Sequence, residues 1–188
     1  MLEVPDELLE ERARRGLDRF DELWDEVLHM VPPPSFLHQT LANKLHAFLA
    51  PRLLPRGIEV YGETGVFRPE SRGRDYRIPD LAFFRPDQPG LVTERGLEGA
   101  PLVVLEIRSP DDETYEKFEF WAALGVPEVV TIEPATRGIE LFRLAGERFV
   151  ATSADEQGRL HVATVGVRLS TSAGPRLRVE VDGASVEI

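Results

Sequence analysis

The stretch LVVLEIRSPDDETYEKFEFWAALGVPEVV, residues 102–130, decides the fold of this chain. Its first part is an almost wholly apolar run, which predicts a strand over 102–109 that is buried on both faces. The strand carries one acid, Glu106, and a short acidic turn leads to a helix that carries Lys117, one of two lysines in the chain. A buried carboxylate is costly unless its charge is compensated. A metal ion is the common compensation that would also support chemistry.

The helix after this strand is expected to begin at a capping residue, Asp111 or Asp112, and to run to about Leu124. Gly125 suits a left-handed helix terminator, and Pro127 stands just beyond it. Another short buried strand is expected over residues 128–133.

The other segments complete a mixed α/β pattern. Helices are expected over residues 5–15 and from Ser35 onward, with Pro51 and Pro55 ending or kinking the second one. Its apolar face is expected to hold Leu37, Leu41, Leu45, Phe48 and Leu49. Strands are expected at residues 20–30, 57–61, 64–68 and 76–85. After Pro134 the alternation of polar and apolar residues predicts antiparallel hairpins, with turns at Ala145-Gly146 and Asp182-Gly183.

The composition limits the function. The 188 residues, 42% hydrophobic and 29% charged, suit one globular domain. No apolar run is long enough to span a membrane, and the lack of cysteine excludes thiolate sites and suits a cytoplasmic location. The net charge of −11 argues against a generic nucleic-acid binder, although a nuclease could draw local positive charge from a metal. The arginine-rich segment 68–77 is either a phosphate-binding surface or a solvated loop.

A second acid, Asp80, follows Pro79, which marks a bend or an edge in its strand. Lys117 shares the apolar stripe of its helix, so its ammonium group is expected to reach back toward the Glu106 strand. Structural alternatives stay open at this point. Asp80 could be satisfied by turn amides or by Arg77, and Glu106 could pair with Arg108. Lys117 could extend along its stripe to water.

Two acids on neighbouring strands with a nearby lysine suit phosphodiester hydrolysis. The carboxylates would hold one or two Mg²⁺ ions, for which Mn²⁺ could substitute, because hard cations prefer oxygen ligands. The metal would polarise the phosphate and activate water. The lysine would position that water or stabilise charge on phosphorus.

Five phrases in this order resemble a known family: DELWDEVLHMVPPPSFLHQ at 21–39, IPDLAFF at 78–84, APLVVLEIRSPDD at 100–112, EKFEFWAALGVPEVVTIEP at 116–134 and GIELFRL at 138–144. The chain is similar to the Uma2 (DUF820) restriction-endonuclease-like family within the PD-(D/E)XK nuclease superfamily. The resemblance implies an α/β (α+β) restriction-endonuclease-like core over about 20–150, a mixed sheet flanked by helices, within a single domain 1–188. A C-terminal antiparallel extension over about 138–188 completes it.

The resemblance also implies site residues. Asp80, Glu106 and Ile107 would be metal ligands, and Lys117 would be the catalytic lysine. In most of the superfamily the lysine stands two residues after the second acid, where this chain has Arg108. Lysine on the next helix is the Uma2 pattern.

An N-terminal acid often accompanies the pair, and Glu22 matches it best. Glu26 falls where the family usually has glycine, and His38 matches the start of the family's helix with a capping, substrate-proximal or structural role.

We therefore predict a Mg²⁺-dependent DNA endonuclease that forms a homodimer, since two-fold symmetry suits cleavage of two strands. One alternative is a catalytically inactive nuclease fold that serves as a binding or assembly module, which the −11 charge and the altered lysine position favour. Another is a hydrolase that uses the paired carboxylates of Asp80 and Glu106 without metal.

Overall fold

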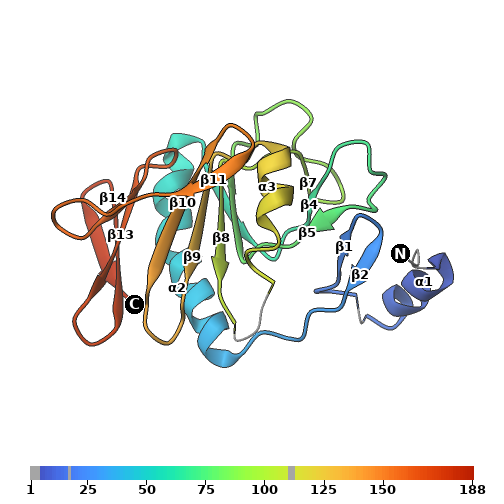
Figure 1. Ribbon diagram of the computed structural model, residues 1–188, viewed down its shortest axis with the longest axis horizontal. Coiled ribbons are helices and arrows are strands. Elements are labelled where there is room, and N and C mark those ends of the chain that lie inside the picture. The colour runs from blue at the N-terminus through green and yellow to red at the C-terminus, as the bar shows by residue number, and fades with distance from the viewer. Residues whose placement is uncertain (1–4, 17, 110–112) are drawn as a thin grey trace.

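The strand that carries Glu106 lies inside a six-stranded mixed sheet in the computed structural model, which describes residues 5–16, 18–109 and 113–188 (Figure 1). The strand order is β11-β10-β9-β8-β6-β3. Strands β8 and β9 are parallel, and the other neighbours in this sheet are antiparallel. The strands are β3 (Glu59–Gly62), β6 (Leu81–Phe84), β8 (Val103–Ile107), β9 (Glu128–Ile132), β10 (Ile139–Ala145) and β11 (Arg148–Ala151).

Two smaller sheets accompany the six-stranded one. A five-stranded sheet has the order β2-β1-β5-β4-β7, and a four-stranded antiparallel sheet has the order β12-β13-β14-β15. The first comprises β1 (Glu22–Trp24), β2 (Val27–His29), β4 (Val66–Phe67), β5 (Tyr76–Arg77) and β7 (Leu97–Glu98). The second comprises β12 (Leu160–Val162), β13 (Val167–Ser172), β14 (Arg176–Val181) and β15 (Ala184–Glu187). The predicted C-terminal hairpins are thus confirmed, including the turn at Asp182-Gly183, where both residues have positive φ.

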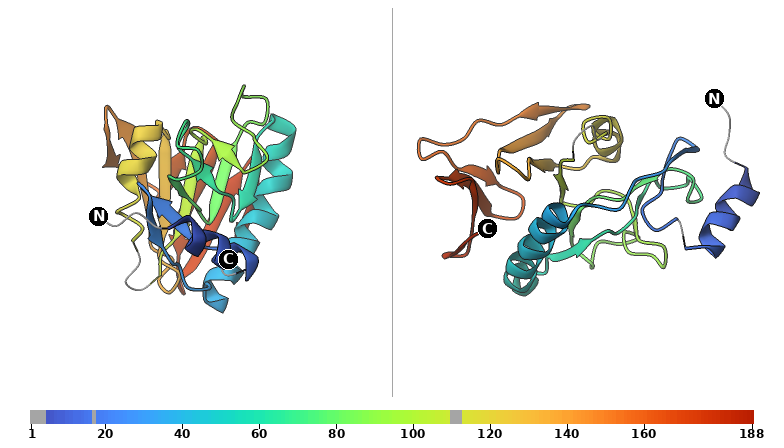
Figure 2. Two further views of the ribbon diagram at one scale, coloured as in Figure 1. Left: turned by 90° about the vertical axis from the view of Figure 1, so that its right-hand side faces the viewer. Right: turned by 90° about the horizontal axis from the view of Figure 1, so that it is seen from below.

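Helices cover both faces of the six-stranded sheet. The helices are α1 (Asp6–Arg14), α2 (Phe36–Leu53), the 3₁₀ helix η1 (Leu54–Arg56) and α3 (Phe118–Leu124). In the view from below, α2 and the four-stranded sheet lie on one side of the six-stranded sheet and α3 on the other (Figure 2). No helix among the described residues is both long and apolar enough to cross a lipid bilayer.

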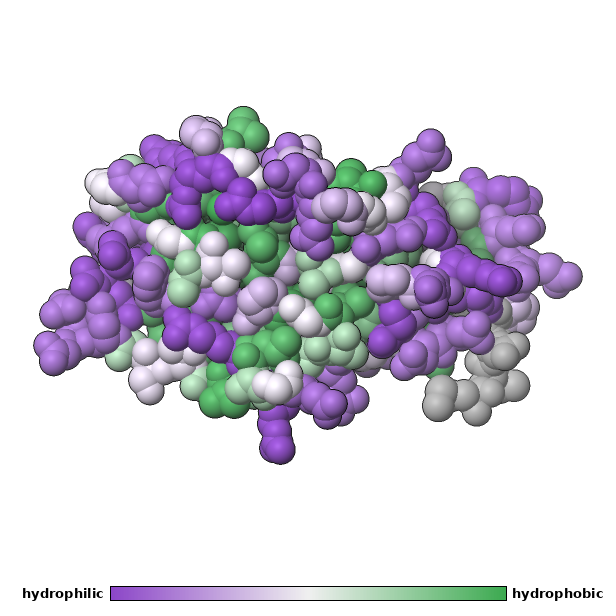
Figure 3. Space-filling view, turned by 90° about the horizontal axis from the view of Figure 1, so that it is seen from above, coloured by the Kyte–Doolittle hydropathy of each residue, from purple (hydrophilic) through white to green (hydrophobic). Residues whose placement is uncertain are grey.

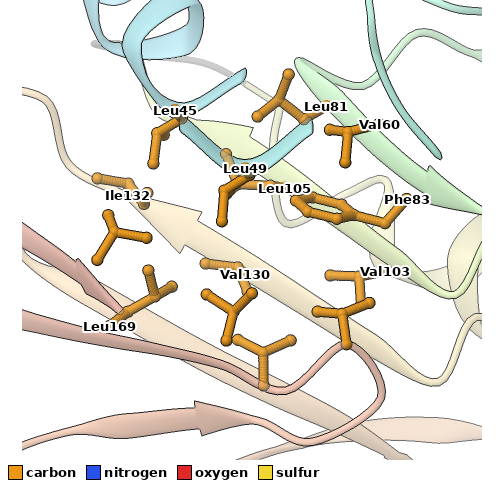
Figure 4. Packing of buried hydrophobic residues seen from close by; sticks show 14 of the residues in the cluster. Leu45, Leu49, Val60, Leu81, Phe83, Val103, Leu105, Val130, Ile132 and Leu169 are labelled. Carbon is orange, nitrogen blue, oxygen red and sulfur yellow. The ribbon is translucent and has the colours of Figure 1, made fainter. Parts of the chain in front are cut away.

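Strand β8 alternates between two buried clusters, as predicted. Val103, Leu105 and Ile107 join the cluster beneath α2 and the four-stranded sheet (Figure 4). Val104 joins the opposite cluster beneath α3, and strand periodicity places Glu106 on that same side. Burial on both faces explains why the strand is almost wholly apolar. The outer surface, by contrast, carries many hydrophilic side chains, with hydrophobic ones showing through near the middle of one face (Figure 3).

Helix α2 begins where its sequence predicts, because the Ser35 hydroxyl accepts a hydrogen bond from the His38 N–H. It ends at Leu53, between the two prolines expected to end or kink it. One expected core residue is wrong: Leu37 is 44% exposed. It lies in the first turn of α2, next to the exposed Phe36.

The strand predicted over residues 20–30 is wrong, because this segment forms the hairpin β1–β2. Its two-residue turn is Asp25-Glu26, and both residues have positive φ. The Glu26 N–H donates to the Arg74 carbonyl, and the Asp25 N–H donates to the Asp75 carboxylate. These contacts hold a turn that usually uses glycine or asparagine.

The strand predicted over residues 76–85 is split into β5 and β6, which belong to different sheets. The break falls at residues 78–80, and Pro79 lies inside it, as its missing N–H requires.

The predicted start of the third helix is also wrong. Residues 114–117 form turns, and α3 begins only at Phe118. The expected caps Asp111 and Asp112 lie outside the described residues. Gly125 ends the helix in the left-handed conformation, as predicted. Lys117 therefore lies in the turn before α3 and not within the helix. Ion pairs with carboxylates that are distant in the sequence hold its side chain.

Gly96 supplies a stability prediction. It has φ 145°, and a Cβ there would lie 2.3 Å from the carbonyl oxygen of Gly65, the residue just before β4. Gly96→Ala is therefore expected to lower the free energy of unfolding by roughly 2–4 kcal/mol. Gly90 also has positive φ but open space around it, so Gly90→Ala should cost only about 1 kcal/mol. Urea unfolding measures both variants, and equal losses would contradict the steric argument.

Candidate active site

Side chains from four separate segments meet at one cavity of about 730 Å³. Glu22 comes from β1, Asp80 from the bend before β6, Glu106 from β8, and Lys117 from the turn before α3. Ile107 and His38 also line this cavity. The structure therefore brings together all the residues that the sequence proposed as catalytic or metal-ligating.

Lys117 lies between two buried acids. Its Nζ donates a hydrogen bond to Glu22 Oε1 at 2.8 Å and lies 3.7 Å from Glu106 Oε1. The side chain is 13% exposed, so the alternative in which it extends to water is wrong. Glu22 is satisfied by two further donors: the Ile78 N–H at 2.8 Å and the Trp24 indole N–H at 2.7 Å. Glu22 thus acts as an anchor for the ammonium group.

The electrostatics separate the roles of Glu106 and Lys117. Burial raises the pKa of Glu106 to about 8, and the nearby Asp80 and Glu22 charges add to the shift against the opposing effect of Lys117. Burial alone would lower the pKa of Lys117, but the carboxylates of Glu106 and Glu22 outweigh it and raise this pKa. Lys117 is therefore a fixed positive charge, unsuited to accepting a proton near neutral pH.

Asp80 is held by two donors from different elements. Its Oδ2 accepts the Ile107 N–H at 2.6 Å, and its Oδ1 lies 2.6 Å from His38 Nε2. The bend at Pro79 directs the carboxylate to the end of β8. Arg77 is not its partner, which corrects one structural alternative: that guanidinium pairs with Asp75 at 2.9 Å.

The donor set suits a hard divalent cation. Glu106 Oε1 is buried without a hydrogen-bond partner among the described residues, so this oxygen is available to a ligand. The described residues contain no group of three or more histidine, aspartate or glutamate side chains that could hold a metal ion. A cation would thus be held by Asp80, Glu106 and a main-chain oxygen. The Ile107 carbonyl suits that place, since the N–H and C=O of a strand residue point to the same side. Magnesium is commonly held by one or two carboxylates and retains several waters.

Other residues singled out by the sequence lie elsewhere. Glu26 pairs with Arg74 at 3.2 Å and is not part of the cavity lining. Arg108 stacks over the Tyr115 ring, 4.9 Å from its centroid, instead of pairing with Glu106. Arg108 is thus not part of the cavity lining, whereas Lys117 is.

The arginine-rich segment 68–77 is tied to acids of the same chain. Arg68 and Arg77 both pair with Asp75, and Arg74 pairs with Asp6 and Glu26. These ion pairs favour a structural loop over a phosphate-binding surface.

The sequence did not reveal the contacts of His38 in the cavity, nor the apolar residues at 30–34 that line it. His38 contacts Asp80 through Nε2, and its Nδ1 lies 3.4 Å from the Ser109 hydroxyl. The residues are 42 and 71 positions apart, so no local pattern reveals the contacts. The run of three prolines at 32–34, which no sequence pattern connects with the site, lines the cavity beside Met30 and Val31.

Comparison with known proteins identifies a family and solved structures of similar fold. A family model described as "Uma2: Putative restriction endonuclease" matches residues 7–173. The chain also resembles a crystal structure described as a putative nuclease belonging to DUF820 from Anabaena variabilis ATCC 29413, with a TM-score of 0.61 and 15% sequence identity. The match covers 78% of this chain and 83% of the other. At this sequence identity it shows that the two chains share a fold. No curated protein matches the chain. The predicted α+β fold class is confirmed.

Proposed function

This chain belongs to the Uma2 family, and from that premise we propose that it is a Mg²⁺-dependent nuclease that hydrolyses phosphodiester bonds of DNA. One observation carries the proposal: Asp80 and Glu106 face one cavity together with a buried, charged Lys117. Acidic oxygens for a cation beside a fixed ammonium group suit the charge that develops on a phosphate under attack.

Each side chain has a distinct task in this proposal. Asp80 and Glu106 would hold the cation with the Ile107 carbonyl, and the bound cation would supply positive charge to the phosphate and to the attacking water. Lys117 would donate to a non-bridging phosphate oxygen, because its raised pKa keeps it charged. Glu22 positions Lys117 through the 2.8 Å hydrogen bond rather than contacting the substrate.

His38 supports Asp80 in the same way that Glu22 supports Lys117. Its imidazole contacts Asp80 Oδ1, and the Ile107 N–H donates to Asp80 Oδ2. These two contacts fix the orientation of the carboxylate. Such supporting hydrogen bonds orient metal ligands before the metal binds.

The test is hydrolysis of two substrates, a supercoiled plasmid and a single-stranded circular DNA. Wild-type protein should cut with Mg²⁺ or Mn²⁺ and stop with EDTA. Asp80→Asn and Glu106→Gln should each reduce the rate by at least about 100-fold, because each removes a ligand charge. Glu26→Gln, which changes an acid outside the cavity, is the matched control and should cut normally.

A second readout does not depend on cleavage. Mn²⁺ should raise the melting temperature of wild-type protein and of Glu26→Gln, but not that of Glu106→Gln, because ligands that bind only the folded state stabilise it. Equal cutting by all four proteins, or cutting in EDTA, would refute the assignment. A lack of both cutting and stabilisation would leave the chain as a non-catalytic member of the fold.

We also propose, in keeping with the sequence analysis, that the protein works in the cytoplasm as a homodimer. Its two sites would each cut one strand. Light scattering coupled to size-exclusion chromatography measures the mass directly.

A further inference from the structure

A second cavity of about 420 Å³ adjoins the proposed active site. It shares Asp80 and Glu63 with the first cavity, so the two meet at the carboxylate that would hold the cation. From there it extends along one face of α2, where Gln39, Asn43 and His46 follow one another at helical spacing. The proposed function leaves this extension without a role.

The lining of the second cavity is polar and mostly neutral. Asn43 is exposed, and its amide has no hydrogen-bond partner among the described residues. His46 uses Nε2 to contact the Val60 carbonyl at 2.9 Å, which leaves its other ring nitrogen for another partner. Amide and imidazole groups of this kind contact sugar and phosphate oxygens in nucleic-acid complexes.

The cations available here are few. Arg19 is the arginine that lines this cavity, and it pairs with Glu63 at 3.0 Å. Lys117 in the first cavity is likewise held between two acids. Affinity for nucleic acid depends on lysine and arginine contacts to phosphates, and each contact contributes less for a single strand than for a duplex. This lining therefore suits a ligand that is held by hydrogen bonds and by its bases.

The first cavity offers a surface for a base. Met30 is 65% exposed and Val31 is 43% exposed, and both line this cavity beside the three prolines at 32–34. A duplex hides the faces of its bases, whereas a single strand can lay them on such apolar surface.

We propose that the two cavities form one track for a single nucleic-acid strand, which crosses Asp80 and continues along Gln39, Asn43 and His46 of α2. The proposal rests on the proposed nuclease function for placing the scissile phosphate at Asp80. From Gln39 to His46 the helix rises about 10.5 Å, which is longer than the rise per nucleotide along the axis of a duplex, about 3.4 Å. The second cavity therefore extends along α2 by more than one nucleotide step.

The test compares two substitutions that change the net charge equally. Asn43→Asp places a carboxylate in the track, and Lys44→Gln removes a charge from the next, exposed position, which does not line either cavity. Both positions are exposed on α2, and asparagine and aspartate have similar helix propensities, so both variants should fold. Binding of a fluorescein-labelled single strand, and of the same sequence closed into a hairpin duplex, is measured by fluorescence anisotropy with Mg²⁺. The protein carries Glu106→Gln throughout, so that the strand stays intact.

The single strand should bind more tightly than the hairpin, and Asn43→Asp should weaken its binding by about tenfold, while Lys44→Gln changes it by less than about twofold. Equal weakening by the two variants, tighter binding of the hairpin, or no binding of the single strand by the parent protein would each overturn the proposal. The nuclease assignment is judged separately by the cutting assay. Strand binding as expected without cutting by wild-type protein leaves the track standing and removes the nuclease function, and cutting without the Asn43 effect does the reverse.

Discussion

Lys117→Met is expected to reduce DNA cutting by at least about 100-fold, because it removes the fixed charge that would stabilise the phosphate in the transition state. Methionine keeps the length of the apolar stem, so the packing of the turn before α3 is retained. The same substitution leaves Glu22 and Glu106 buried without a cation. Breaking a buried pair from one side costs about 3–5 kcal/mol, and the variant should lose about this much free energy of unfolding.

Two further variants separate the loss of activity from the loss of stability. Lys44→Met changes the other lysine of the chain, which is exposed on α2, and should alter neither property. The double variant Glu22→Gln with Lys117→Met removes the uncompensated charge of Glu22 and should recover part of the stability without recovering cutting. Recovery of cutting by the double variant would show that Lys117 acts only through folding.

Stability without metal is expected to fall as the pH rises from about 4.5 to about 8. Glu106 ionises near its ordinary value of 4.5 in the unfolded chain, whereas burial raises its pKa to about 8 in the folded protein. Within this window the folded state holds a proton that the unfolded state has lost, so raising the pH favours unfolding. The loss is on the order of 4 kcal/mol at most. The raised pKa of Lys117 acts only above its ordinary value of 10.5, outside this window.

Urea unfolding in EDTA at about pH 5, 6.5 and 8 measures this dependence. In Glu106→Gln the decline should be much smaller, because the neutral amide has no proton to lose. Glu26→Gln changes an acid that is 43% exposed and should follow wild-type protein. Parallel curves for wild-type protein and Glu106→Gln would show that this carboxylate ionises normally in the folded state. Addition of Mn²⁺ should restore stability most at the highest pH, where the ligand is already deprotonated.

The sequence reveals β8 well because its two faces are both buried, which leaves an apolar run with one acid as its signature. It also indicates where α2 begins, since Ser35 is a local cap. It does not reveal the turn at Asp25-Glu26, because contacts from Arg74 and Asp75, about fifty residues away, hold that turn in place of glycine. Tertiary contacts override local preference here.

The site shows the same division. Asp80 and Glu106 stand out because acids in apolar strands are unusual, and the structure brings them to one cavity. The start of α3 could not be found, because Lys117 is held by Glu22 and Glu106 rather than by a helical pattern. The contact of His38 with Asp80 likewise joins the start of α2 to a bend 42 residues later. Local spacing carries no information about such pairs.

The hydrogen bond from Lys117 to Glu22 joins residues 95 positions apart, and this separation has a consequence during protein synthesis. A chain still emerging from the ribosome holds Glu22 and Asp80 long before Lys117 leaves the exit tunnel. Contacts of such long range form late in folding. Under the proposed function, a half-made polypeptide would therefore lack the ammonium group that DNA cutting requires.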